Sequence, residues 1–195
     1  MRVRFTAIAL IMSAPFAAHV FAQTVGSEVQ RDINQESRIE QGLKSGQLST
    51  GEAARLERGE ARIDRMESKS LKDGNLSPEE AARIQRAQNR ESGAIDRLKH
   101  NDVTSDPNSA SSQRMQTDVQ RNINQQSRTE QGIQSGQLTN KEASQLERGQ
   151  ARVDRAEARA GANGHVSARE QARTQRQENA QSRRIFRDKH NNQTR

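Results

Sequence analysis

The chain has 195 residues, of which 32 are lysine or arginine and 25 are aspartate or glutamate, so its formal net charge is +7. It contains no cysteine, which excludes disulfides, thiol nucleophiles, Cys-ligated metals and a lipid-modified N-terminal cysteine. Hydrophobic residues make up only 30% of the chain and aromatic residues 2%, which is too little to bury a conventional core. Stability must therefore come from helix propensity, helix caps, ion pairs and thin apolar seams.

Residues 1–22 have the features of a secretory signal peptide. Arg2 and Arg4 precede a mostly apolar run from Phe5 to Phe16, and the segment ends in Val20-Phe21-Ala22, which fits the small-residue rule for cleavage. The apolar run is too short to span a bilayer comfortably. We expect cleavage after Ala22 and export to the periplasm or beyond, as a protein that is not integral to the membrane.

Two copies of one module follow the leader. The stretch from Val29 to Gln35 matches the stretch from Val119 to Gln125, and the match continues without a gap to the ends of both copies. The expected organisation is a first helical module at 23–101, a flexible linker at 102–114, a second helical module at 115–191 and a disordered tail at 192–195. The linker is small, polar and interrupted by Pro107.

A short turn motif occurs four times and divides each module into helices. Each copy has a glycine (Gly46, Gly74, Gly136 or Gly164), an apolar residue two positions later, a Ser or (in one copy) Thr, and a Glu three residues further on. The glycine suits the end of a helix, and the hydroxyl residue with the Glu forms a capping box. The sequence predicts an all-α fold of two tandem three-helix modules, with antiparallel helices at 27–45, 50–73, 78–99, 117–135, 140–163 and 168–189.

The middle helix of each module separates its charges. Acidic residues form one face, at Glu57, Glu60, Asp64 and Glu67 in the first module and at Glu147, Asp154 and Glu157 in the second. Roughly opposite lie the cations that we call the basic stripes, which are Arg55, Arg58, Arg62, Arg65, Lys69, Arg148, Arg152, Arg155 and Arg159. The favoured interpretation is that acidic and basic faces of neighbouring helices pair; the alternative is that the basic stripes bind a polyanion or another partner.

The turns also resemble the second half of an EF-hand calcium loop. The first ligand position would be occupied by Gln41, Lys69, Gln131 or Arg159, and none of these is a carboxylate. We therefore expect no calcium ion, other metal or cofactor, and interpret the turns as degenerate EF-hand-like structure. The catalytic motifs that we sought, including His-Glu-x-x-His, are missing, so an enzyme with a small-molecule substrate is not expected.

Two resemblances bear on function. The stretches Leu138-Thr139-Asn140-Lys141 and Leu48-Ser49-Thr50-Gly51 loosely resemble the Leu-Thr-x-x-Gln motif of Spy-type periplasmic chaperones. The segments 41–48 with 56–65, and 131–138 with 146–155, are similar to repeats in a group of small, exported, basic helical bacterial proteins without a settled function. These resemblances imply export and a helical fold. We expect a non-enzymatic binding or envelope-stress accessory protein that holds unfolded or anionic partners; the alternatives are polyanion binding at the envelope surface and a purely structural role.

Overall fold

The computed structural model describes the backbone of residues 16–191 and the side chains of residues 25–191. The described chain forms six helices: α1 (Phe16–Ser45), α2 (Thr50–Ser70), α3 (Pro78–Lys99), α4 (Ala110–Gln134), α5 (Asn140–Ala160) and α6 (Ala168–Lys189). No strand occurs among these residues, which confirms the predicted all-α class. The tail at 192–195 and most of the expected signal peptide lie outside the described residues.

Helix bounds agree with the sequence expectation for α3 and α6 and differ elsewhere. Helices α2 and α5 each end three residues early, at Ser70 and Ala160. Helix α1 begins at Phe16 instead of residue 27. Helix α4 begins at Ala110 and thus takes in residues that were expected to form a linker. The cause is a local cap, because the Ser109 hydroxyl accepts a hydrogen bond from the backbone N–H of Ser112 at 3.2 Å.

The connection between the two halves is also anchored. The backbone N–H of Ser105 donates to the carbonyl of Gly46 at 2.9 Å, and its hydroxyl donates to the carbonyl of Leu48 at 2.8 Å. These bonds tie the 100–109 connection to the turn between α1 and α2. The expectation of a flexible linker over 102–114 is wrong at its C-terminal end, because residues from Ala110 onward are helical. The two hydrogen bonds of Ser105 were not expected from the sequence.

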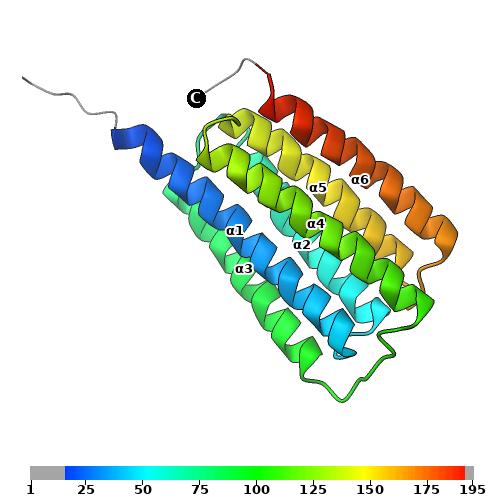
Figure 1. Ribbon diagram of the computed structural model, residues 1–195. Coiled ribbons are helices and arrows are strands. Elements are labelled where there is room, and N and C mark those ends of the chain that lie inside the picture. Colours follow the sequence, from blue (N-terminus) through cyan, green and yellow to red (C-terminus); the bar gives the residue numbers. More distant parts are fainter. Residues whose placement is uncertain (1–15, 192–195) are drawn as a thin grey trace, which may run out of the picture.

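All four predicted capping boxes are present. In each, the hydroxyl accepts the backbone N–H of the Glu, and the Glu carboxylate accepts the backbone N–H of the capping residue. Each of the four turn glycines has a positive φ, between 73° and 94°. These turns reverse the chain within a few residues, so consecutive helices run antiparallel (Figure 1).

The two halves of the chain share their core. Helix α2 packs most closely on α5, and α1 packs most closely on α4, so each main pairing joins one half to the other. Helix α3 packs against α1 and α2, whereas α6 packs against α4 and α5 on the opposite side (Figure 1). One apolar cluster contains Val29 and Leu146, and the other contains Leu43 and Val166. The expectation of two modules, each packed on itself, is therefore wrong, because seams this thin are buried only when the halves are combined.

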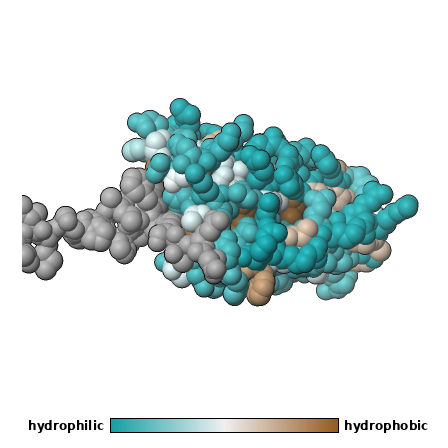
Figure 2. All heavy atoms as spheres, turned by 90° about the horizontal axis from the view of Figure 1, so that it is seen from above, coloured by the Kyte–Doolittle hydropathy of each residue, from teal (hydrophilic) through white to brown (hydrophobic). Residues whose placement is uncertain are grey.

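The outside of the bundle is polar. The face seen in Figure 2 is mostly hydrophilic, with small apolar areas between the polar side chains, and the large apolar side chains that are exposed among the described residues are Val103 and Phe186. Within residues 16–191, no helix is both long enough and apolar enough to cross a membrane. The apolar clusters fill the two ends of the bundle, and a polar layer lies between them.

Candidate metal centre

Carboxylates are concentrated inside the bundle. Nine of them come from three helices and are at most 2% exposed; they are Asp32 and Glu36 of α1, Glu57, Glu60, Asp64 and Glu67 of α2, and Glu147, Asp154 and Glu157 of α5. We call this set the carboxylate core. The acidic faces of α2 and α5 thus point inward together with the apolar residues, and α1 adds two acids to them.

Among the residues whose side chains are described, no buried cation balances these acids. Among the described residues, every buried polar side chain is an acid, an amide, a serine or a threonine. Both carboxylate oxygens of Glu57 and of Glu60 lack a hydrogen-bond donor, and so do both those of Glu36. Removing an unpaired carboxylate from water costs several kcal/mol even after relaxation. A group of this kind requires protons or bound cations to compensate its charge.

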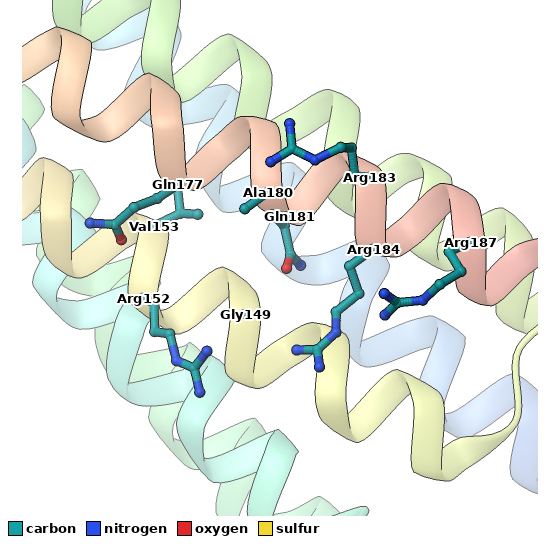
Figure 3. Close-up of a pocket in the computed structure, with 9 residues that line it drawn as sticks. All are labelled: Gly149, Arg152, Val153, Gln177, Ala180, Gln181, Arg183, Arg184 and Arg187. Carbon is teal, nitrogen blue, oxygen red and sulfur yellow. The ribbon is translucent and has the colours of Figure 1, made fainter.

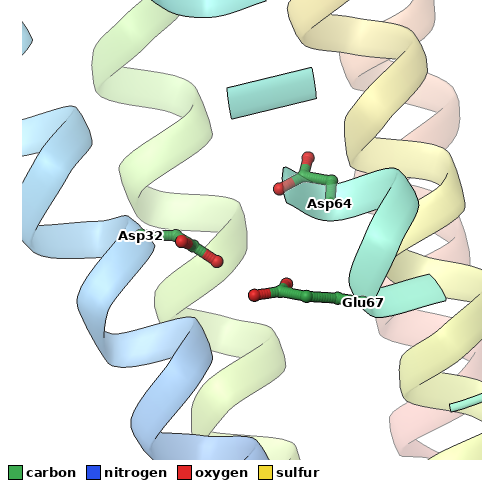
Figure 4. A group of neighbouring side chains, drawn as sticks. All are labelled: Asp32, Asp64 and Glu67. Atoms are coloured by element: carbon green, nitrogen blue, oxygen red, sulfur yellow. The ribbon is translucent and has the colours of Figure 1, made fainter. Parts of the chain in front are cut away.

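The first cluster joins α1 to α2. Oxygen atoms of Asp32, Asp64 and Glu67 lie within 4.8 Å of one another, and Figure 4 shows the Asp32 and Glu67 carboxylates converging from the two helices. The carboxamide of Gln88, in α3, donates to Asp32 Oδ1 at 2.8 Å and to Glu67 Oε1 at 3.3 Å. Gln88 therefore fixes one oxygen of each acid, while Asp32 Oδ2 and Glu67 Oε2 keep no donor.

The second cluster joins three helices. Oxygen atoms of Glu36, Glu57 and Asp154, from α1, α2 and α5, also lie within 4.8 Å of one another. Asp154 Oδ1 accepts a hydrogen bond from Gln150 Nε2 at 2.9 Å, whereas its Oδ2 has no donor. Glu36 and Glu57 are close enough to share a proton, and the Asn122 carboxamide also lies beside Glu36, where it lowers the pKa of that carboxyl slightly against the larger effect of burial.

Glu60 lies between the two clusters. It belongs to neither, yet the charges of Asp32, Glu36 and Asp154 all raise its pKa, after burial as the largest cause. Its two oxygens lack any donor and it is fully buried. This position gives Glu60 access to both clusters, which makes the carboxylate core one continuous acidic layer.

The second half of the chain replaces several of these acids by amides. Asn122, Gln126 and Gln150 stand where the first half has Asp32, Glu36 and Glu60. Asn122 Nδ2 donates to Glu157 Oε2 at 2.8 Å. The amide of Gln126 is 2% exposed, and neither of its polar atoms has a partner. The carboxylate core is therefore asymmetric, with most of its acids on α1 and α2.

Burial dominates the protonation of the carboxylate core. It raises the pKa of Glu57 well above the ordinary value, and the charges of Glu36 and Glu157 add to the rise. Burial is also the largest cause of a raised pKa in five further acids of the core, which are Glu60, Asp64, Glu67, Glu147 and Glu157. A nearby multivalent cation would act in the opposite direction, because it stabilises the ionised form.

The chemistry of the donors selects the class of cation. All the grouped ligand atoms are carboxylate oxygens, and the side chains that the structure describes bring no histidine into the core. The histidines whose side chains are described, at 100, 165 and 190, lie at helix ends or in a turn. Hard cations such as Ca²⁺, Mg²⁺ and Mn²⁺ prefer oxygen ligands, whereas softer metals favour imidazole or thiolate.

The basic stripes lie outside the bundle. Eight of their nine residues are exposed and Arg155 is partly exposed. The stripe residues of α2 occupy every exposed position of that helix. On α5 the pKa of Arg155 is lowered, first by burial and then by the charges of Arg65, Arg159 and Arg152. None of the ion pairs found among the described residues joins a stripe to an acidic face. The favoured expectation of pairing between neighbouring helices is therefore wrong, because the acids point inward.

The sequence held a signal for the carboxylate core that we did not use. A helix with so few apolar residues can bury only the face opposite its cations, and that face is acidic in both α2 and α5. No similar sequence pattern indicated that Asp32 and Glu36 would be buried.

Comparison with protein-family models, curated proteins and solved structures finds no match to this chain. The fold and the site of the described residues define a six-helix bundle with a carboxylate core.

Proposed function

We propose that this is an exported, non-enzymatic protein whose carboxylate core binds hard divalent cations. The observation that carries the proposal is that nine buried carboxylates have no buried positive charge beside them among the described residues. Two divalent ions would compensate four of the negative charges and satisfy oxygens that have no donor. The competing explanation is that protons shared between pairs of carboxyl groups compensate the charge of the core. The dependence of stability on pH, with and without metal ions, distinguishes the two explanations.

Two sub-sites are expected within the core. The first is formed by Asp32, Asp64 and Glu67, and the second by Glu36, Glu57 and Asp154. Each offers three carboxylates, which can supply six oxygens when they bind in a bidentate manner. Six to eight oxygens at 2.3–2.6 Å are typical of a calcium ion, and six at shorter range are typical of magnesium. Glu60 is placed to bind either ion or to bridge them.

The test is direct binding of Ca²⁺, Mg²⁺ and Mn²⁺ to the purified protein at pH 7.5, measured by calorimetry and by equilibrium dialysis with elemental analysis. We expect saturable binding of at least one of these ions and a higher melting temperature in its presence. Glu36→Gln, which introduces the residue of the second half, should weaken binding at least about tenfold. Glu79→Gln, an exposed change of the same charge, is the matched control.

Two outcomes would overturn the proposal. One is that the parent protein binds none of the three ions more tightly than the Glu36→Gln variant does. The other is that both variants lose the same affinity, because that result would place the ions on the surface. If the protein instead melts at a constant temperature with and without ions while its stability follows pH, shared protons alone compensate the core.

A second candidate function uses the outside of the molecule. The basic stripes are exposed and free of ion pairs with the acidic faces, which favours weak binding of anionic or unfolded envelope partners. Suppression of aggregation of a model client protein tests the chaperone form of this function. Binding to a polyanion that weakens steeply with salt tests the other form, and binding that does not respond to salt would reject it.

A further inference from the structure

A second charged feature lies on the surface between α5 and α6. An open groove of about 520 Å³ is lined by four arginines, Arg152 of α5 and Arg183, Arg184 and Arg187 of α6, and no carboxylate lines it. Figure 3 shows the guanidinium groups of Arg152 and Arg184 on either side of Gly149. We call these residues the arginine groove. It is separate from the carboxylate core and makes little use of the basic stripes, sharing only Arg152 with them.

The floor of the groove is built by a glycine and a glutamine. A side chain at Gly149 would collide with the carboxamide of Gln181, so the two helices approach closely there. Gln181 is held in place because its Nε2 donates to the carbonyl of Leu146 at 2.8 Å. The floor is therefore uncharged and fixed, and only the arginine side chains at its rim can adjust to a ligand.

One neighbouring acid offsets part of the positive charge. Asp188 lies 3.1 Å from Arg187 Nε and 4.0 Å from Arg184 Nε, measured from its carboxylate oxygens. No ion pair among the described residues includes Arg152 or Arg183. The groove keeps an excess of positive charge, and like charges held side by side favour an anion that compensates them.

The first half of the chain gives an internal comparison. Its equivalent surface has Arg62 and Arg97 in place of Arg152 and Arg187, but it has Gly93 and Ala94 in place of the other two arginines. It also has an acid, Glu91, where the second half has Gln181. On the groove lining the second half has therefore gained two cations and lost one acid, while beside the lining it has gained one acid, Asp188 in place of Leu98.

From this difference we propose that the arginine groove binds phosphate groups carried close together on one ligand. Guanidinium groups bind phosphate oxygens through paired N–H donors, and arginines on two sides of a groove can contact neighbouring phosphates. A soluble oligophosphate and the headgroups of anionic phospholipids present this same chemistry. The groove is open to solvent along its length, so either source can reach it.

Pyrophosphate binding to the purified protein tests the proposal, measured by calorimetry in buffer freed of divalent cations so that chelation makes no contribution. The double variant Arg183→Gly with Arg184→Ala, which restores the residues of the first half, should weaken binding at least about tenfold. Gln181→Glu, which restores the acid, should also weaken it. Arg86→Ala with Arg90→Ala removes the same charge from exposed positions of α3 and should leave binding unchanged.

The outcomes separate the proposal from its alternatives. Equal losses in the groove variant and the α3 variant would mean diffuse attraction to a basic surface and would overturn it. Absence of pyrophosphate binding, together with no groove-dependent binding to vesicles of anionic phospholipid, would also overturn it. Groove-dependent binding to vesicles alone would identify a lipid headgroup as the source. Because the carboxylate core is tested with metal ions and other variants, either proposal can fail without the other.

Discussion

Asp32 and Asn122 occupy equivalent positions in the two halves of the chain, yet they have opposite roles. Asp32 Oδ1 accepts a hydrogen bond from Gln88 at 2.8 Å, whereas Asn122 Nδ2 donates one to Glu157 at 2.8 Å. The change from carboxylate to carboxamide is repeated at Glu36 and Gln126. The first half therefore supplies six of the nine acids of the carboxylate core, whereas the second half supplies Glu147, Asp154 and Glu157 together with amides that orient part of it.

This relationship predicts the effect of Asp32→Asn. The carboxamide can still accept the hydrogen bond from Gln88, but it removes one buried negative charge. In metal-free buffer at pH 8 the variant should be more stable than the parent by about 1–3 kcal/mol, as measured by urea denaturation. Its affinity for divalent cations should fall at the same time. A variant that loses stability under these conditions would show that Asp32 is already compensated in the protein.

Stability without metal should fall as the pH rises. A carboxyl whose pKa is raised on folding binds its proton more tightly in the folded state, so ionising it favours unfolding. The pKa of Asp32 is raised to about 7 and that of Asp154 to about 6, with burial the largest cause in both, and burial raises that of Glu178 to about 8. Stability is therefore fully present below about pH 4 and is lost progressively towards pH 8, by about 1.4 kcal/mol per pH unit for each extra proton held.

Melting temperatures of the metal-free protein between pH 4.5 and 8 provide the measurement. Saturating divalent cation should flatten or reverse the trend, because the metal favours the ionised form. A melting temperature that rises with pH in metal-free buffer would contradict the expectation.

Gly59 and Gly93 should respond in opposite ways to alanine. A Cβ at Gly59 would collide with the carboxylate of Glu91 in α3, whereas a Cβ at Gly93 would meet only the end of a flexible arginine. Gly59→Ala should therefore destabilise the protein by about 1 kcal/mol, because the Glu91 carboxylate has to leave its partly buried position. Gly93→Ala should stabilise it by up to about 1 kcal/mol through helix propensity. Thermal or urea denaturation of both variants measures these changes in stability. A similar increase in the stability of both variants would mean that α3 can move away from α2.

Neither half of the chain should fold alone. Helices α1 and α2 bury their apolar and acidic faces mainly against α4 and α5, so residues 23–101 by themselves expose most of that surface. We expect a gradual melt by circular dichroism for this fragment and for residues 102–191, and a cooperative melt when the two are mixed. A cooperative melt of either fragment as a monomer would restore the separate modules that the repeat first indicated.

Local features of this fold were accessible from the sequence. Ser49 with Glu52, and the equivalent pairs, specify the helix starts through neighbouring backbone groups, so pattern alone places them. Gly59 and Gly149 also interrupt their helices, at a cost of about 1 kcal/mol each relative to alanine. The structure explains both by close helix–helix approach, since each lies against a side chain of the next helix in its own half.

Long-range features were not accessible in this way. The pairing of α1 with α4 depends on which combination buries the thin seams, and short turns had favoured neighbours in the chain. The carboxylate core was missed for a related reason. Charged faces are usually solvated, so the acidic face that contains Glu57 was expected to pair with the basic face of a neighbouring helix. In the structure the basic stripe takes every exposed position of α2, and the acidic face therefore points inward.

The acids lie inside the molecule and the cations lie outside, so the net charge of the protein depends on how many protons or metal ions the carboxylate core holds. Each proton or metal ion taken up by the carboxylate core adds positive charge without moving a side chain on the surface. Electrophoretic mobility towards the cathode should therefore increase as the core fills, at constant shape. Through the same long-range field, a filled protein attracts anions from further away than an unfilled one.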